Sequence, residues 1–130
     1  MTSPVLELQG AIVVLLKAAG IAGSRIYDRV PEAPTFPYVS FGPADELSDD
    51  ADCITGFEVT MQLDCWSRAV GFREVQQLAD AVRATLHGYD FSLTNNAAVL
   101  FEHRVTRIFR DPDGLTSHAA LTFTAFVEQP

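Results

Sequence analysis

The stretch that covers residues 57–86 contains a strand pattern followed at once by a helix pattern. Apolar and polar residues alternate strictly over residues 57–65, and this period of two predicts a strand with one face on a core. After a turn at residues 66–69, apolar residues recur every three or four positions over residues 72–86, as in an amphipathic helix. A strand and a helix that share one core determine the architecture of this region, but the pattern contains no catalytic chemistry.

An earlier helix is predicted near the beginning of the chain, where Ser3 is a suitable N-cap and Pro4 suits the first helical position. Gly20 then provides a stop signal. Val13 and Val14 are apolar although they lie off the core-facing stripe, so we expect this helix to be covered on more than one side. Two explanations are open at this point: deep burial within the domain, or a contact with another subunit.

The rest of the chain consists of strand patterns separated by turn signals. Strands are predicted at residues 38–41, 57–65, 99–110 and 115–127, with an acidic loop at 42–53, a short edge strand at 91–94 and a turn at 111–114. The element order is therefore α-β-β-α-β-β. We expect a single α+β domain over residues 1–130, in which two helices pack on one face of a mainly antiparallel sheet of four main strands.

The charge of the chain limits its partners. Its 130 residues include 17 acidic and 9 basic side chains, which give a net charge of −8. Proteins that grip nucleic-acid phosphates need clustered Lys and Arg, so this composition argues against tight binding to DNA or RNA. The apolar run at residues 11–16 is too short to cross a bilayer and has no basic lead-in, so we expect neither a membrane partner nor a signal peptide.

Both cysteines flank the central predicted strand. If that strand is continuous, Cys53 and Cys65 lie about 40 Å apart, whereas a disulfide needs Cα atoms within about 7 Å. We therefore expect two reduced thiols, as is usual inside cells.

The acidic loop is the cluster that most invites a metal interpretation, and it contains Asp45, Glu46, Asp49, Asp50 and Asp52. Their order lacks the alternating ligands, central glycine and terminal Glu of a helix-loop-helix calcium site, so a solvated loop is expected. The sequence has no Cys-x-x-Cys, no His pair at metal-ligand spacing, no Gly-x-Ser-x-Gly elbow and no glycine-rich phosphate loop. We therefore expect no enzymatic activity, no metal and no cofactor.

Arg104, Arg107 and Arg110 form the one basic cluster, and all three belong to a predicted strand. On a regular strand Arg104 and Arg110 share a face while Arg107 points to the other, which argues against a single phosphate-binding stripe. Two interpretations remain: ordinary surface charge, or ion pairs with the acidic loop of a neighbouring subunit.

Four short segments occur in a fixed order along the chain: RIYDRVP at residues 25–31, FPYV at 36–39, CWSR at 65–68 and RDPDGL at 110–115. Together they resemble the tail-completion, or tail terminator, family of long-tailed phages, prophages and phage-derived gene transfer agents. The resemblance extends from the first predicted helix to the last strand.

This resemblance implies a structural role in a virion or phage-like particle assembled in the bacterial cytoplasm. Proteins of this kind form a ring, expected to be a hexamer, on the head-proximal end of the tail tube. The ring ends tube polymerisation and joins the head-side connector, while DNA passes through the hole without specific binding. Its implied partners are therefore identical subunits, the tail tube protein and the head-tail connector protein.

Candidate contact surfaces are the polar face of the central strand, the outer face of the first helix, the acidic loop and the arginine cluster. The residues are Val13, Val14, Lys17, Asp45, Glu46, Asp49, Asp50, Asp52, Glu58, Gln62, Asp64, Arg104, Arg107 and Arg110. Two other classes of function stay open: an acidic inhibitor or immunity-like module that binds a basic partner, and a small enzyme with an unrecognised site.

Overall fold

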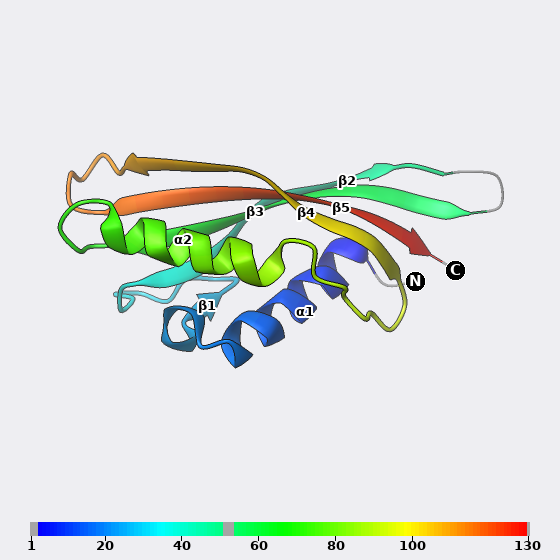
Figure 1. Ribbon diagram of the computed structural model, residues 1–130, viewed down its shortest axis with the longest axis horizontal. Helices are drawn as coiled ribbons and strands as arrows, with labels where there is room; N and C mark the ends of the chain where they lie inside the picture. Colours follow the sequence, from blue (N-terminus) through cyan, green and yellow to red (C-terminus); the bar gives the residue numbers. More distant parts are fainter. Residues whose placement is uncertain (1–2, 51–53, 130) are drawn as a thin grey trace.

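One long sheet and two helices form the two layers of the protein, which a computed structural model describes for residues 3–50 and 54–129 (Figure 1). The elements are α1 (Pro4–Ala18), η1 (Ile21–Ser24), β1 (Ile26–Tyr27), β2 (Tyr38–Ser48), β3 (Thr55–Ser67), α2 (Arg73–Leu86), β4 (Ala97–Arg110) and β5 (Ser117–Gln129). The sheet has the strand order β1-β2-β3-β5-β4, and only the β1–β2 pair is parallel. The predicted α+β class, with two helices and a mainly antiparallel sheet, is confirmed; the short parallel strand β1 was not predicted.

The core lies between the sheet and the helices. Strand β3 is central, and its alternate residues Val59, Met61, Leu63 and Cys65 are buried, as the period of two predicted. Helix α2 contributes the predicted stripe of buried residues, namely Val75, Leu78, Ala79, Val82 and Leu86. Burial, followed by the charge of Asp64, raises the pKa of the Cys65 thiol far above its usual range, so this cysteine acts as a small apolar core residue.

Helix α1 begins where the sequence predicted, and its first turn is bound to the sheet. The Ser3 side chain accepts a hydrogen bond from the backbone N–H of Leu6, and Pro4 occupies the first turn. Glu46 of β2 adds a carboxylate at the same helix end, accepting hydrogen bonds from Ser3 Oγ at 2.8 Å and from Val5 N at 3.1 Å. A negative charge is favourable there because the helix dipole is positive at its N-terminus.

Strand β2 is much longer than predicted, which corrects the boundary of the acidic loop. The predicted strand ended at residue 41, but β2 continues to Ser48, so the prediction of a loop was wrong for residues 42–48. Gly42 and Pro43 are turn formers, yet here they form an irregularity between Phe41 and Ala44, after which pairing with β3 resumes. A Cβ on Gly42 would lie 2.6 Å from Asp64 Oδ2, so any larger residue here would displace the Asp64 carboxylate.

The edge strand predicted at residues 91–94 was also wrong, since this segment is irregular. Phe91 is buried in the core, and the following Asn95 and Asn96 donate hydrogen bonds to the Glu7 carboxylate of α1. The segment is therefore attached to α1 rather than to a strand. Burial tends to raise the pKa of Glu7, but the hydrogen bonds from Asn96 and Asn95 together lower it.

Candidate interaction surface

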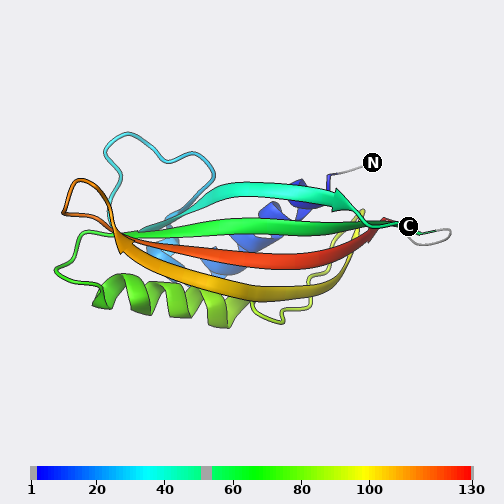
Figure 2. The same ribbon diagram turned by 90° about the horizontal axis from the view of Figure 1, so that it is seen from above.

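Both helices cover the same face of the sheet, and we name the opposite face the outer face (Figure 2). Near the start of β2 the segment before this strand lies against the outer face, because the Phe36 ring is 5.0 Å from the Tyr38 ring. The polar side of β3, predicted as a contact surface, belongs to it: Glu58, Thr60 and Gln62 are partly exposed there. The cross-strand register places residues of β2, β5 and β4 beside them. The outer face divides into two halves of different chemistry.

One half of the outer face carries a row of rings that crosses the sheet, which we name the aromatic row. Its members are Tyr38 of β2, Trp66 of β3, His118 of β5 and Phe109 of β4, which are paired across adjacent strands. Ring centroids are 6.2 Å apart for Tyr38–Trp66, 3.9 Å for Trp66–His118 and 4.5 Å for Phe109–His118. Cross-strand ring pairs of this kind stabilise a sheet, and here they connect four strands.

A buried polar network lies beside the aromatic row. His118 Nε2 is 2.6 Å from Asp64 Oδ1, Gln62 Nε2 donates to the same oxygen at 2.9 Å, and Trp66 Nε1 donates to Ser40 Oγ at 2.9 Å. The exposed fraction is only 6% for Asp64 and 9% for His118. Of the predicted contact residues, Asp64 and Gln62 are thus hydrogen-bonded within the subunit.

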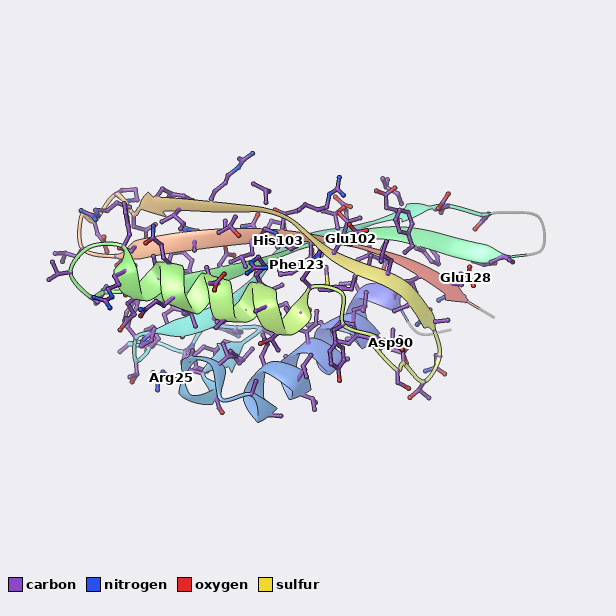
Figure 3. The ribbon with its side chains drawn as sticks, in the orientation of Figure 1. Arg25, Asp90, Glu102, His103, Phe123 and Glu128 are labelled. Carbon is purple, nitrogen blue, oxygen red and sulfur yellow. The ribbon has the colours of Figure 1, made fainter. Side chains whose placement is uncertain are left out.

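The other half of the outer face is acidic and apolar, and we name it the acidic half. Asp45, Glu58 and Glu102 come from three strands and occupy two neighbouring cross-strand rows. None of the ion pairs among the described residues includes any of the three. Figure 3 labels Glu102 near the middle of β4 and Glu128 toward the end of β5. The cross-strand row of Glu58 also contains three exposed apolar side chains: Leu47, Phe126 and Leu100.

The carboxylates of the predicted acidic loop differ in their positions and hydrogen bonds. Asp45 lies in the acidic half, whereas Glu46 points to the other side of β2 and binds the start of α1. Asp49 pairs through its backbone N–H with Gly56 O at 2.8 Å, and Asp50 Oδ1 accepts from Gly56 N at 3.1 Å. Asp52 lies outside the described residues. Across residues 3–50 and 54–129, no three His, Cys, Asp or Glu side chains are grouped so that they could hold a metal ion.

The arginine cluster is divided between the faces, as predicted for Arg107 and Arg110. Arg107 pairs with Ala120 and Arg110 with Ser117, so an odd separation places them on opposite sides of β4. Arg110 lies over the Phe72 ring at 4.8 Å, on the helix side. Arg104 falls within a register shift between His103 and Val105, so its face cannot be counted from Arg110. Within the described parts of the chain, no ion pair joins these arginines to a carboxylate.

The free edge of β4 is partly covered by the end of α2. Gly88 N donates to Phe101 O at 2.7 Å, and His103 N donates to His87 Nδ1 at 3.0 Å. These bonds satisfy backbone groups that an edge strand otherwise offers to another chain. Burial, followed by the charges of Arg83 and His87, lowers the pKa of His103. The β4 edge is therefore a poor site for the addition of a strand from another chain, and the outer face is the better candidate interaction surface.

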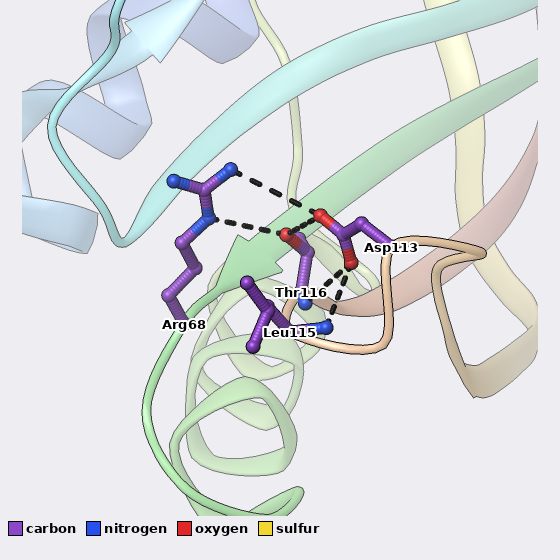
Figure 4. Close-up of polar contacts among 4 residues, drawn as sticks. All are labelled: Arg68, Asp113, Leu115 and Thr116. Carbon is purple, nitrogen blue, oxygen red and sulfur yellow. Dashed lines mark hydrogen bonds and ion pairs between the residues drawn. The ribbon is translucent and has the colours of Figure 1, made fainter.

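At the end of the sheet beyond the aromatic row, the loop before α2 is attached to the β4–β5 turn (Figure 4). Arg68 Nε donates to Thr116 Oγ1 at 3.2 Å, and its Nη2 lies 3.9 Å from Asp113 Oδ2. Asp113 also accepts from the backbone N–H of Leu115 and of Thr116. Hydrogen bonds, those from Thr116 foremost, lower the pKa of the Asp113 carboxyl.

The predicted contact residues of α1 differ in exposure. Val13 is partly buried against the core, whereas Val14 is 69% exposed and Lys17 is also exposed. Reasoning from the sequence missed the aromatic row, although the parity of Trp66 with Asp64 already assigned the indole to the polar side of β3. None of the described helices is long and apolar enough to span a bilayer.

Comparisons with known proteins identify the family to which the chain belongs. A family profile described as "Tail completion protein gp17" matches residues 10–128. Among solved structures, a chain of the "Virion of native gene transfer agent (GTA) particle" superposes with a TM-score of 0.89 at 27% identity, covering 98% of this chain and 99% of that one. A comparison with curated proteins found no match. The resemblance noted in the sequence is confirmed, and the chain belongs to the tail completion protein gp17 family.

Proposed function

We propose that this chain is a structural tail protein of a phage-like particle, in which it forms a ring, expected to be a hexamer, that caps the tail tube. The observation that carries this proposal is the full-length similarity to a chain of a gene transfer agent virion. In this role the ring ends tube polymerisation and joins the head-side connector. No catalytic step is part of the proposal.

A ring of identical subunits needs contacts in which one surface of a subunit binds a different surface of the next. The protein offers distinct surfaces of this kind: the outer face, the exposed side of α1 with Val14 and Lys17, and the loops at each end of the sheet. Arg104 and Arg107 remain proposed partners for acidic residues of a neighbouring subunit, including Asp49 and Asp50. Each subunit brings a net charge of −8, so such pairs also reduce repulsion within the ring.

We assign the acidic half of the outer face to the channel through which DNA passes. Asp45, Glu58 and Glu102 repel phosphates, and a polyanion then slides past instead of binding. Thr60 of β3 and Thr124 of β5 lie between Asp45 and Glu102 in one cross-strand row. Contacts with the tube and the connector then use surfaces other than the acidic half.

Deleting the gene and imaging the particles tests this function directly. The expected result is tails of uncontrolled length or heads without attached tails, and complementation with the intact gene restores normal particles. Normal particles from the deletion strain would refute the proposal. Native mass spectrometry of the purified protein, alone and with the tube protein, is expected to show a ring of about six subunits.

A further inference from the structure

An apolar groove lies on the helix side of the molecule, between α1 and the segment that follows α2. It has a volume of about 590 Å³, and apolar side chains dominate its lining. From α1 it is lined by residues four apart, Leu6, Gly10 and Val14, and from the opposite side by Tyr89 and Leu93. Leu6, Val14 and Tyr89 are among the exposed large apolar residues of the protein. This groove is the second apolar side of the first helix that the sequence predicted.

Gly10 is unexplained by the fold of the isolated subunit. It lies inside α1, where glycine is the least favourable residue after proline, and a Cβ at this position would meet nothing within 4 Å. The subunit therefore does not need a glycine there for space or for backbone conformation. The missing side chain instead leaves the groove open between Leu6 and Val14, so that a side chain of another molecule can enter it.

The opposite end of the molecule carries apolar side chains that project into solvent. Val70 has an exposed fraction of 101%, and Leu115 is 71% exposed. Their loops are bound together, because Ser117 Oγ donates to Gly71 O at 3.2 Å and Arg68 donates to Thr116. Figure 1 shows these loops at one end of the long axis, while the segment after α2 lies toward the other end. We name the pair Val70 and Leu115 the apolar tip.

The charges beside Val70 of the apolar tip and beside the groove are opposite in sign. Val70 lies between Arg68 of the loop and Arg73, the first residue of α2. Arg68 pairs with Asp113 within the subunit, whereas Arg73 is exposed and belongs to none of the ion pairs among the described residues. The groove is lined by the carboxylates of Glu7 and Asp90 and by no Lys or Arg. Figure 3 shows Asp90 on the segment that borders the groove. Apolar character and, near Val70, charge therefore match between two surfaces of the same chain.

We propose that the groove is the docking site for the apolar tip of a second copy, with Val70 lying over Gly10 and next to Val14. Because the two surfaces are different and lie toward opposite ends, the contact is head-to-tail and propagates until a ring closes. This inference rests on the proposed ring and identifies the subunit contact that builds it. A partner protein or a symmetric pair of grooves is the competing occupant, and the experiment separates them.

Disulfide trapping tests the contact in cells that assemble the particle. Two tagged versions of the chain, one with Val14→Cys and the other with Val70→Cys, are co-expressed in a Cys53→Ser background and mildly oxidised. The expected product is a disulfide that joins the two different tags, with no dimer when either version is expressed alone. A Val14→Cys homodimer would indicate a symmetric contact and overturn the proposal, and so would the absence of any mixed dimer.

Filling the groove provides a second test that does not depend on disulfides. Gly10→Leu is expected to abolish the mixed disulfide and the ring. The thermal midpoint of the subunit should not fall, since a Cβ at this position meets nothing within 4 Å and leucine favours a helix more than glycine does. Gly10→Ala is the matched control and is expected to retain both. A Gly10→Leu protein that still assembles would overturn the contact but leave the ring intact. Normal particles after gene deletion would refute the tail function whatever the disulfides show.

Discussion

The two halves of the outer face belong to the same strands but use their side chains in opposite ways. At the aromatic row, polar groups are hydrogen-bonded within the subunit: Asp64 to His118, and Trp66 to Ser40. At the acidic half, Asp45, Glu58 and Glu102 have no ion-pair partner among the described residues, and apolar neighbours are exposed. One half therefore stabilises the sheet, whereas the other presents charge. Substitutions should affect stability in the first half and assembly in the second.

The largest loss of stability is expected from His118→Ala. This change removes a ring stacked on Trp66 and leaves the buried carboxylate of Asp64 without its 2.6 Å hydrogen bond. Losing one partner of such a buried pair costs about 3 kcal/mol, which urea unfolding measures. Glu58→Gln, on the same face in the acidic half, is the matched control and should change stability by less than about 0.5 kcal/mol. Equal losses from both variants would show that the two halves do not differ.

A smaller difference is expected between two adjacent carboxylates, Asp45 and Glu46. Glu46→Ala removes the acceptor for Ser3 Oγ and Val5 N at the start of α1, so it should destabilise the protein by about 1 kcal/mol. Asp45→Ala changes only the outer face and should have an effect below about 0.5 kcal/mol. Chemical denaturation of both variants under the same conditions gives the comparison. A larger effect at Asp45 would contradict the assignment of faces to β2.

Asp45 and Glu46 also show which features of the structure could be predicted from the sequence alone. Periodicity was sufficient for β3, α2 and the core-facing residues of β5, because long amphipathic elements repeat one signal many times. It failed for β2, since Gly42 and Pro43 give a turn signal even where a neighbouring strand holds the chain in the sheet. The different roles of Asp45 and Glu46 depend on the position of α1, which no local pattern contains. The aromatic row likewise depends on the register of four strands.

On the helix side, the Glu7 carboxylate of α1 makes the stability of the protein dependent on pH. Burial acts to raise its pKa, but the hydrogen bonds from Asn96 and Asn95 hold it below the usual 4.5. A group whose pKa is lowered on folding stabilises the protein fully above its unfolded pKa and loses this contribution as pH falls through the folded value. The difference in unfolding free energy between the native chain and Glu7→Gln should therefore be constant above pH 4.5 and shrink below it. A difference that grows on acidification would show the opposite sign of shift.

The smallest effect on stability, and the clearest effect on function, is expected when the acidic half is neutralised. The triple variant Asp45→Asn, Glu58→Gln, Glu102→Gln keeps side-chain size, and none of the three sites belongs to an ion pair among the described residues. Its thermal midpoint should match that of the native chain, and particles should assemble. If these carboxylates line the channel, the loss of repulsion lets DNA adhere, and DNA delivery per particle should fall. The matched control is Asp80→Asn on the helix side, which should leave delivery unchanged. Normal delivery from the triple variant would contradict the assignment of the acidic half to the channel and would favour a contact between subunits instead.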